Sequence, residues 1–189
     1  MNGQPATRTD AQPAPRWTER LEELSPSAPP ASAAAWLTEP GLLTERLRAC
    51  CEGLPGLTVI SEAEAPLATR DAALLGYSGR VAFVREVELT CDGRPWVYAQ
   101  TLIPPALLAR QRWLASLGRA ALGERLAAVV GLERGPLEFA RLAAGDRLYH
   151  RALRDLHDPP SSLWARRSWF AIEGDRLLVQ EVFLPEAHA

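Results

Sequence analysis

Residues 81–103 read VAFVREVELTCDGRPWVYAQTLI and predict two antiparallel strands joined by a tight turn. Asp92-Gly93 lies at the centre of the stretch, and an Asp-Gly pair between two alternating apolar runs is a strong signal for a hairpin turn. We expect one strand over residues 80–90 and the returning strand over residues 95–103. Hairpins join strands without a crossover, so this stretch favours an antiparallel sheet.

The first of these strands carries a charge on its apolar side. Strand residues alternate between faces, so Val87 and Leu89 point one way while Glu86 and Glu88 point the other way, toward water. Arg85 falls on the apolar side of that register. A guanidinium there needs a partner, because burying an unpaired charge is costly.

The last predicted strand repeats the anomaly with the opposite sign. Glu181 shares a face with Val179 and Phe183. Two interpretations follow for Arg85 and Glu181. They pair with each other as a buried ion pair between strands, or they form the polar ends of a closed apolar pocket for a small molecule.

The rest of the chain predicts a single α+β domain. Residues 1–31 are rich in Pro, Ala and Ser and predict a partly disordered extension, which leaves residues 32–189 for the domain. We expect an antiparallel sheet of about six strands with helices packed on one side. The expected strands are 57–65, 80–90, 95–103, 137–142, 163–172 and 177–184, and the expected helices are 33–38, 43–51, 106–117 and 122–130, with a loop through Gly76 and Gly79.

Composition excludes several kinds of chemistry. All 21 basic residues among the 189 are arginine, so lysine Schiff bases, pyridoxal-phosphate anchors and Walker-type phosphate loops are excluded. The formal net charge is -2 with no clustered basic face, which argues against a nucleic-acid partner. No apolar run has the length of a membrane span and no signal peptide opens the chain, so we expect a cytoplasmic protein.

The cysteines and histidines do not form a metal-site pattern. Cys50, Cys51 and Cys91 lack the spacing of a zinc site, and His150 and His157 begin no ligand motif. We expect reduced, core-filling thiols and neither a metal nor a cofactor. Arg166-Arg167 in the expected strand predicts a solvent-facing pair of charges, with one arginine at a pocket rim as the alternative.

A series of short motifs runs from about residue 32 to residue 185. They are GLLTERL at 41–47, REV at 85–87, CDGRPW at 91–96, TLIP at 101–104, LG at 117–118 and 122–123, LWARRS at 163–168 and QEVFLP at 180–185. Each is short, but their order and spacing together resemble the chorismate pyruvate-lyase family.

The resemblance implies a lyase that converts chorismate to 4-hydroxybenzoate and pyruvate, a step toward ubiquinone. It implies an antiparallel sheet with helical flaps over an internal pocket, a monomer, and no cofactor. By position in the motifs, Arg85 would hold the ring carboxylate together with the backbone amides of Leu43 and Leu122. Glu181 would meet the ring hydroxyl, either as a general base or only to position it.

One position departs from the family pattern. Where the family commonly has an arginine in the second central strand, this chain has Gln100, which would then face the substrate's second carboxylate. This keeps two alternatives open: a degenerate lyase that binds product without turnover, and a non-catalytic sensor of small aromatic acids with the same fold.

Overall fold

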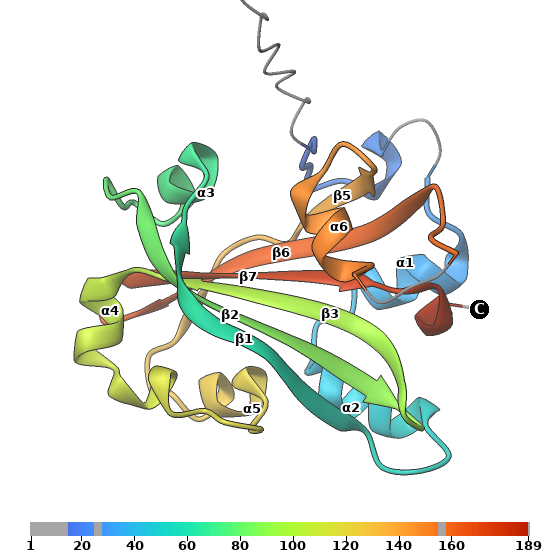
Figure 1. Ribbon diagram of the computed structural model, residues 1–189, viewed down its shortest axis with the longest axis horizontal. Coiled ribbons are helices and arrows are strands. Elements are labelled where there is room, and N and C mark those ends of the chain that lie inside the picture. The colour runs from blue at the N-terminus through green and yellow to red at the C-terminus, as the bar shows by residue number, and fades with distance from the viewer. Residues whose placement is uncertain (1–14, 25–27, 155–157, 189) are drawn as a thin grey trace, which may run out of the picture.

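The computed structural model describes residues 15–24, 28–154 and 158–188. Within them, one antiparallel sheet has the strand order β1-β2-β3-β7-β6-β4, and β5 also pairs with β6 (Figure 1). The α+β class with an antiparallel sheet is confirmed; the described residues form seven strands where about six were expected. The strands are β1 (Gly56–Pro66), β2 (Val81–Cys91), β3 (Arg94–Ile103), β4 (Glu133–Arg134), β5 (Glu138–Ala143), β6 (Ser162–Ile172) and β7 (Asp175–Phe183).

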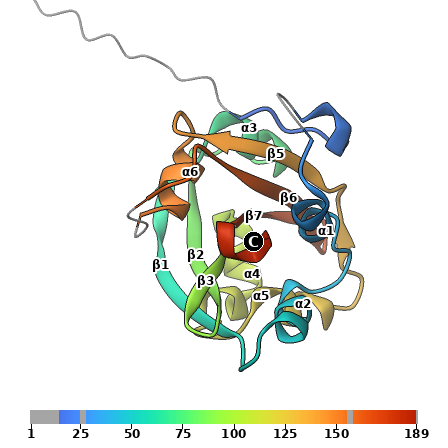
Figure 2. The ribbon, with the colours of Figure 1, turned by 90° about the vertical axis from the view of Figure 1, so that its right-hand side faces the viewer.

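Helices lie on both sides of this sheet, whereas the sequence predicted one side. Figure 1 shows α3 and α6 above the central strands and α2, α4 and α5 below them, and Figure 2 shows the sheet curled, with β1 and β6 on opposite sides of β7. The helices are α1 (Ala31–Leu37), α2 (Leu43–Cys50), α3 (Thr69–Leu74), α4 (Pro105–Arg110), α5 (Leu122–Ala127) and α6 (Arg147–Ala152), with short 3-10 turns at Leu21–Glu23, Arg112–Ala115 and Pro185–His188.

Both faces of the sheet are apolar enough to need a cover, which is why the helices divide between them. Val182 packs with Leu148 of α6 on one face, while Leu177 packs with Leu122 of α5 on the other. The helix α3 falls where the sequence predicted a loop, because its six residues are too few to show an apolar stripe.

Two tight turns set the alignment of the strands. Asp92 and Gly93 have φ values of 50° and 78°, and Glu173 and Gly174 have φ values of 53° and 86°. Two consecutive residues with positive φ match the twist of the flanking strands. The hairpin predicted at Asp92-Gly93 is therefore confirmed, and the two expected strands 163–172 and 177–184 form a second hairpin.

The resulting register aligns side chains of three central strands in rows. Glu86 of β2 lies opposite Gln100 of β3, which lies opposite Gln180 of β7. Strand neighbours point to opposite faces, so Arg85 and Glu181 project from the other side of the same strands. We call the side of Arg85 and Glu181 the inner face and the side of Glu86 and Gln180 the outer face.

Two expectations about charged side chains were wrong. Glu86 is only 3% exposed rather than facing water, because α6 covers the outer face of the sheet. Arg166 and Arg167 are 2% and 5% exposed rather than solvent-facing, since their strand is also covered on both sides. Each of these three groups has an opposite charge beside it.

The expectation of three reduced cysteines was also wrong. Cys51 at the end of α2 and Cys91 at the end of β2 form a disulfide, with their Cα atoms 5.4 Å apart, while Cys50 is free and exposed. The pairing depends on α2 packing beside the tip of the β2–β3 hairpin, which a separation of 40 residues in sequence does not reveal.

Part of the predicted extension packs on the domain. Thr18 exchanges two backbone hydrogen bonds with Phe139 of β5, and the side chain of Leu24 is buried. The disorder predicted for the beginning of the extension falls on residues 1–14, outside the described residues. No helix in the described part of the chain is long and apolar enough to cross a membrane.

Candidate active site

A cavity of about 360 Å³ lies between the inner face of the sheet and the helices α2 and α5. Four of the residues expected at a ligand site line it together: Arg85, Glu181, Leu43 and Leu122. The two expected charges stand on different strands, β2 and β7, with β3 between them. The structure thus gathers these four positions around one enclosed space.

Arg85 is held firmly with one edge of its guanidinium unused. Its side chain is 2% exposed, its Nε donates a hydrogen bond to Glu62 Oε1 at 2.8 Å, and its Nη2 donates to the carbonyl oxygens of Gly118 and Ala120 at 2.6 and 3.3 Å. Glu62 lies directly opposite Arg85 in the β1–β2 register. Nη1 makes no hydrogen bond within the described residues, which leaves a fixed cationic donor for a ligand in the cavity.

Glu181 is held in the same way by a different partner. Its Oε2 accepts a hydrogen bond from Arg166 Nε at 2.6 Å, and the two residues are opposite in the β6–β7 register. Arg166 Nη1 also donates to the Glu39 carbonyl oxygen at 2.7 Å, in the segment between α1 and α2. Arg85 and Glu181 therefore do not pair with each other, and Arg166 ties the carboxylate to the segment that leads into the α2 flap.

Two free amides come from helix starts at the cavity wall. Leu43 and Leu122 are the first residues of α2 and α5. The N–H groups of the first helical turn have no acceptor within their own helix. Both leucines are buried and line the cavity together with Arg85.

A third arginine at the cavity was missed from the sequence. Arg134 of β4 lines the cavity, donates from Nη1 to the Pro40 carbonyl oxygen at 3.1 Å, and stacks over Phe170. Partial burial and the nearby Arg166 guanidinium lower the pKa of Arg134, while Glu181 opposes that shift. A two-residue strand carries no alternation, so only the fold could locate it. For Arg166 there was a signal: counting back from the Glu173-Gly174 turn places it opposite Glu181.

Gln100 is not brought together with the other four expected residues. It lies on the outer face, where its Nε2 donates a hydrogen bond to Glu86 Oε1 at 3.0 Å. Its neighbour Thr101 faces the inner cavity instead. The physical reason is a register shift in the β2–β3 ladder between Leu89 and Thr90, which brings Thr101 rather than Gln100 opposite Arg85.

The family is decided by comparison with known sequences. A sequence model of the Chorismate lyase family matches residues 17–188. The chain belongs to the chorismate lyase family. It is 44% identical over 154 residues to a probable chorismate pyruvate-lyase of Dechloromonas aromatica, covering 80% of this chain and 85% of that one. It is 42% identical over 161 residues to a protein of the same description from Aromatoleum aromaticum, covering 82% and 86%.

Solved structures show how widely this chorismate lyase fold is shared. PhnF from Mycobacterium smegmatis superposes with a TM-score of 0.58 at 15% identity, over 80% of this chain and 67% of that one. The effector domain of PhnF alone gives a TM-score of 0.55 at 16% identity, over 77% and 90%. At such low identity the likeness shows the fold alone.

Proposed function

We propose that this member of the chorismate lyase family removes pyruvate from chorismate and releases 4-hydroxybenzoate. One observation carries the proposal: the inner cavity has the unused edge of a buried arginine at one end and the carboxylate of Glu181 at the other. The product has a carboxylate and a hydroxyl at opposite ends of a flat ring. The two groups that line the cavity therefore match the two polar groups of the product.

The ring carboxylate is assigned to Arg85. Its Nη1 and the amides of Leu43 and Leu122 supply hydrogen bonds, and the contacts of Arg85 with Glu62 and Gly118 fix the plane of the guanidinium before the substrate arrives. Preorganised donors lose little freedom on binding.

The second carboxylate of chorismate, on the enolpyruvyl group, is assigned to Arg134. Of the three arginines that line the cavity, only Arg134 has no ion pair within the described residues, because Glu62 compensates Arg85 and Glu181 compensates Arg166. Arg134 is also exposed, at the rim, where a departing pyruvate can leave. This assignment replaces the expectation for Gln100.

The chemistry needs positioning more than it needs a reactive side chain. The ether bond between the ring and the enolpyruvyl oxygen breaks, the hydrogen on the hydroxyl-bearing ring carbon leaves as a proton, and the ring becomes aromatic. That proton adds to the methylene carbon of the departing enolpyruvate and gives pyruvate. We assign Glu181 a positioning role, because Arg166 holds its Oε2 and leaves Oε1 to accept the ring hydroxyl.

Incubation of the purified chain with chorismate tests the proposal. We expect 4-hydroxybenzoate to appear by absorbance together with an equal amount of pyruvate, measured with a coupled dehydrogenase. Tight binding of 4-hydroxybenzoate without any pyruvate above the spontaneous rate would instead support a product-binding sensor. All site residues come from one chain, so a monomer suffices. A cytoplasmic location and supply of ubiquinone precursor belong to the same proposal.

A further inference from the structure

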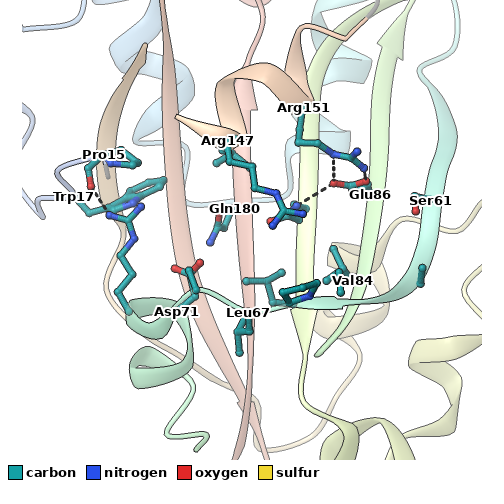
Figure 3. Close-up of a pocket in the computed structure, with 18 residues that line it drawn as sticks. Pro15, Trp17, Ser61, Leu67, Asp71, Val84, Glu86, Arg147, Arg151 and Gln180 are labelled. Atoms are coloured by element: carbon teal, nitrogen blue, oxygen red, sulfur yellow. Dashed lines mark hydrogen bonds and ion pairs between the residues drawn. The ribbon is translucent and has the colours of Figure 1, made fainter. Parts of the chain in front are cut away.

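We infer that the outer face carries a second small-molecule site, for a small ring-containing carboxylate. A cavity of about 310 Å³ lies there between α3, α6 and the strands β1, β2, β3 and β7, and Figure 3 shows the residues that line it. The sheet separates it from the inner cavity lined by Arg85 and Glu181, which we call the lyase cavity. Its volume is close to the 360 Å³ of the lyase cavity, so a ligand of the same size fits.

The floor of this cavity is a row of polar side chains in register. Ser61, Glu86, Gln100 and Gln180 lie opposite one another on β1, β2, β3 and β7. Apolar cavities that merely fail to pack have no such floor, since buried polar groups are costly without a structural or binding role. Among the described residues, Ser61 Oγ and Gln100 Oε1 have no hydrogen-bond partner.

The buried carboxylate in this floor is already satisfied. Glu86 accepts hydrogen bonds from Tyr98 Oη at 2.6 Å, Gln100 Nε2 at 3.0 Å and Arg151 Nε at 2.9 Å, and Arg151 Nη2 also contacts it. A carboxylate with this many donors has little capacity left for a cation or an amine. The site therefore does not take a positively charged ligand through Glu86.

The charge left over in the cavity is positive. Asp71 pairs with Arg167 at 3.2 Å, and Arg70 donates to the Pro15 carbonyl oxygen. Arg147, by contrast, has no hydrogen bond or ion pair within the described residues, and Figure 3 shows its side chain extending over the cavity toward the polar floor. A free guanidinium in the same cavity as the unused Ser61 and Gln100 oxygens suits a carboxylate that also carries a hydroxyl group.

The apolar residues of the remaining wall favour a ligand with a hydrocarbon ring. Leu67, Val84 and Leu102 line the side of the cavity away from Arg147, and Trp17 closes one end. A flat hydrocarbon ring buries its surface there while its carboxylate meets Arg147. A hydroxylated aromatic carboxylate satisfies both requirements. That 4-hydroxybenzoate is the ligand rests on the proposed function, whereas the site itself does not.

Calorimetric titration of 4-hydroxybenzoate into wild-type protein and three variants tests the inference. We expect two sites per chain in the wild type and one remaining site in Arg85→Ala, which disables only the lyase cavity. Arg147→Ala should weaken that remaining site by about tenfold or more in the Arg85→Ala background, since a charge-assisted hydrogen bond is lost. Arg112→Ala, an exposed arginine outside both cavities, is the matched control and should change neither site.

A further variant blocks the outer cavity while all of its charged residues remain. Ala63→Trp fills the outer cavity from β1 without removing any charged group, and it should abolish the site that Arg85→Ala retains. A single site in the wild type that Arg85→Ala eliminates would overturn the inference while leaving the lyase proposal intact. Two binding sites in a protein that forms no pyruvate from chorismate would support the second site and overturn the lyase proposal.

Discussion

The two faces of the sheet treat their buried charges differently. On the inner face, Arg85 and Glu181 each have one partner of opposite charge on the neighbouring strand, and each keeps an unused donor or acceptor edge. On the outer face, Glu86 is surrounded by donors from Tyr98, Gln100 and Arg151. Arg85 and Glu86 are buried to the same extent, at 2% and 3% exposed, so burial does not separate the two faces. What makes a buried charge available to a ligand is the capacity its partners leave unused.

The largest expected effect is on the inner face, with Arg85→Ala. It removes the anchor for the ring carboxylate and leaves Glu62 without its guanidinium, so we expect kcat/KM to fall by about 100-fold or more, mainly through KM. Steady-state kinetics with chorismate measure this. Arg112→Ala is the control, and wild-type kinetics in a folded Arg85→Ala protein would place the substrate elsewhere.

Glu181→Gln should affect turnover more than affinity. The amide keeps the size of the side chain but no longer presents a charged acceptor to the ring hydroxyl, so we expect kcat to fall by about 100-fold. The inhibition constant of 4-hydroxybenzoate, measured in the same assay, should change far less. If that constant worsens as much as kcat, Glu181 contributes uniform binding instead of positioning.

Arg134→Ala should raise the KM for chorismate by about tenfold, which is the value of one charge-assisted hydrogen bond. The product lacks the enolpyruvyl carboxylate, so its inhibition constant at the lyase site should not change. The KM for chorismate and the inhibition constant of 4-hydroxybenzoate are measured on the same protein preparation. Equal losses for both ligands would mean that Arg134 acts on the flap through Pro40 and not on the second carboxylate.

Gln100→Arg introduces the arginine that the resemblance leads us to expect at this position, and it tests the contrast between the two faces. Because Gln100 points to the outer face and lies beside Glu86, we expect kcat/KM to stay within about twofold of wild type, as for substitutions away from a site. Steady-state kinetics with chorismate measure kcat/KM for the variant and the wild type. A large gain in substrate affinity would show that the inner cavity senses this position after all.

The smallest expected effect concerns pH and Asp71 on the outer face. Burial raises the pKa of Asp71 above its usual value of 3.8, with Arg167 opposing the shift. A raised pKa in the folded state means that the stabilising contribution is present below pH 3.8 and is lost as the pH rises through the folded pKa. Denaturant unfolding across that window should show Asp71→Asn gaining stability relative to wild type as the pH rises. A constant difference would contradict the shift.

Strand alternation predicted much of the inner site. Period-two patterning predicts Arg85 and Glu181 each on the apolar side of its own strand, while the family resemblance supplied the pocket that they share. Counting from the Asp92-Gly93 turn would put Gln100 opposite Arg85, in agreement with the resemblance; a register shift between Leu89 and Thr90, which the sequence did not predict, puts Gln100 opposite Glu86 instead.

Other features depended on tertiary packing. Whether Glu86 and Arg166 face water is decided by α6 and α1, which come from distant parts of the chain. The Cys51–Cys91 disulfide likewise needs α2 beside a hairpin tip. Arg134 stands on a strand of two residues, too short for any periodic signal.

The adjacency of Arg85 with Glu86 and of Gln180 with Glu181 gives chain length a direct bearing on catalysis. One residue inserted in β7 ahead of Glu181 would bring Gln180 to the place of the Glu181 carboxylate, and one deleted there would bring Val182. Such a protein could keep its sheet and most of its core yet lose its chemistry. We therefore expect a change of one residue in β7 to be compatible with the proposed site only where a bulge absorbs it, so the parity of the strand matters to the site as much as its side chains do.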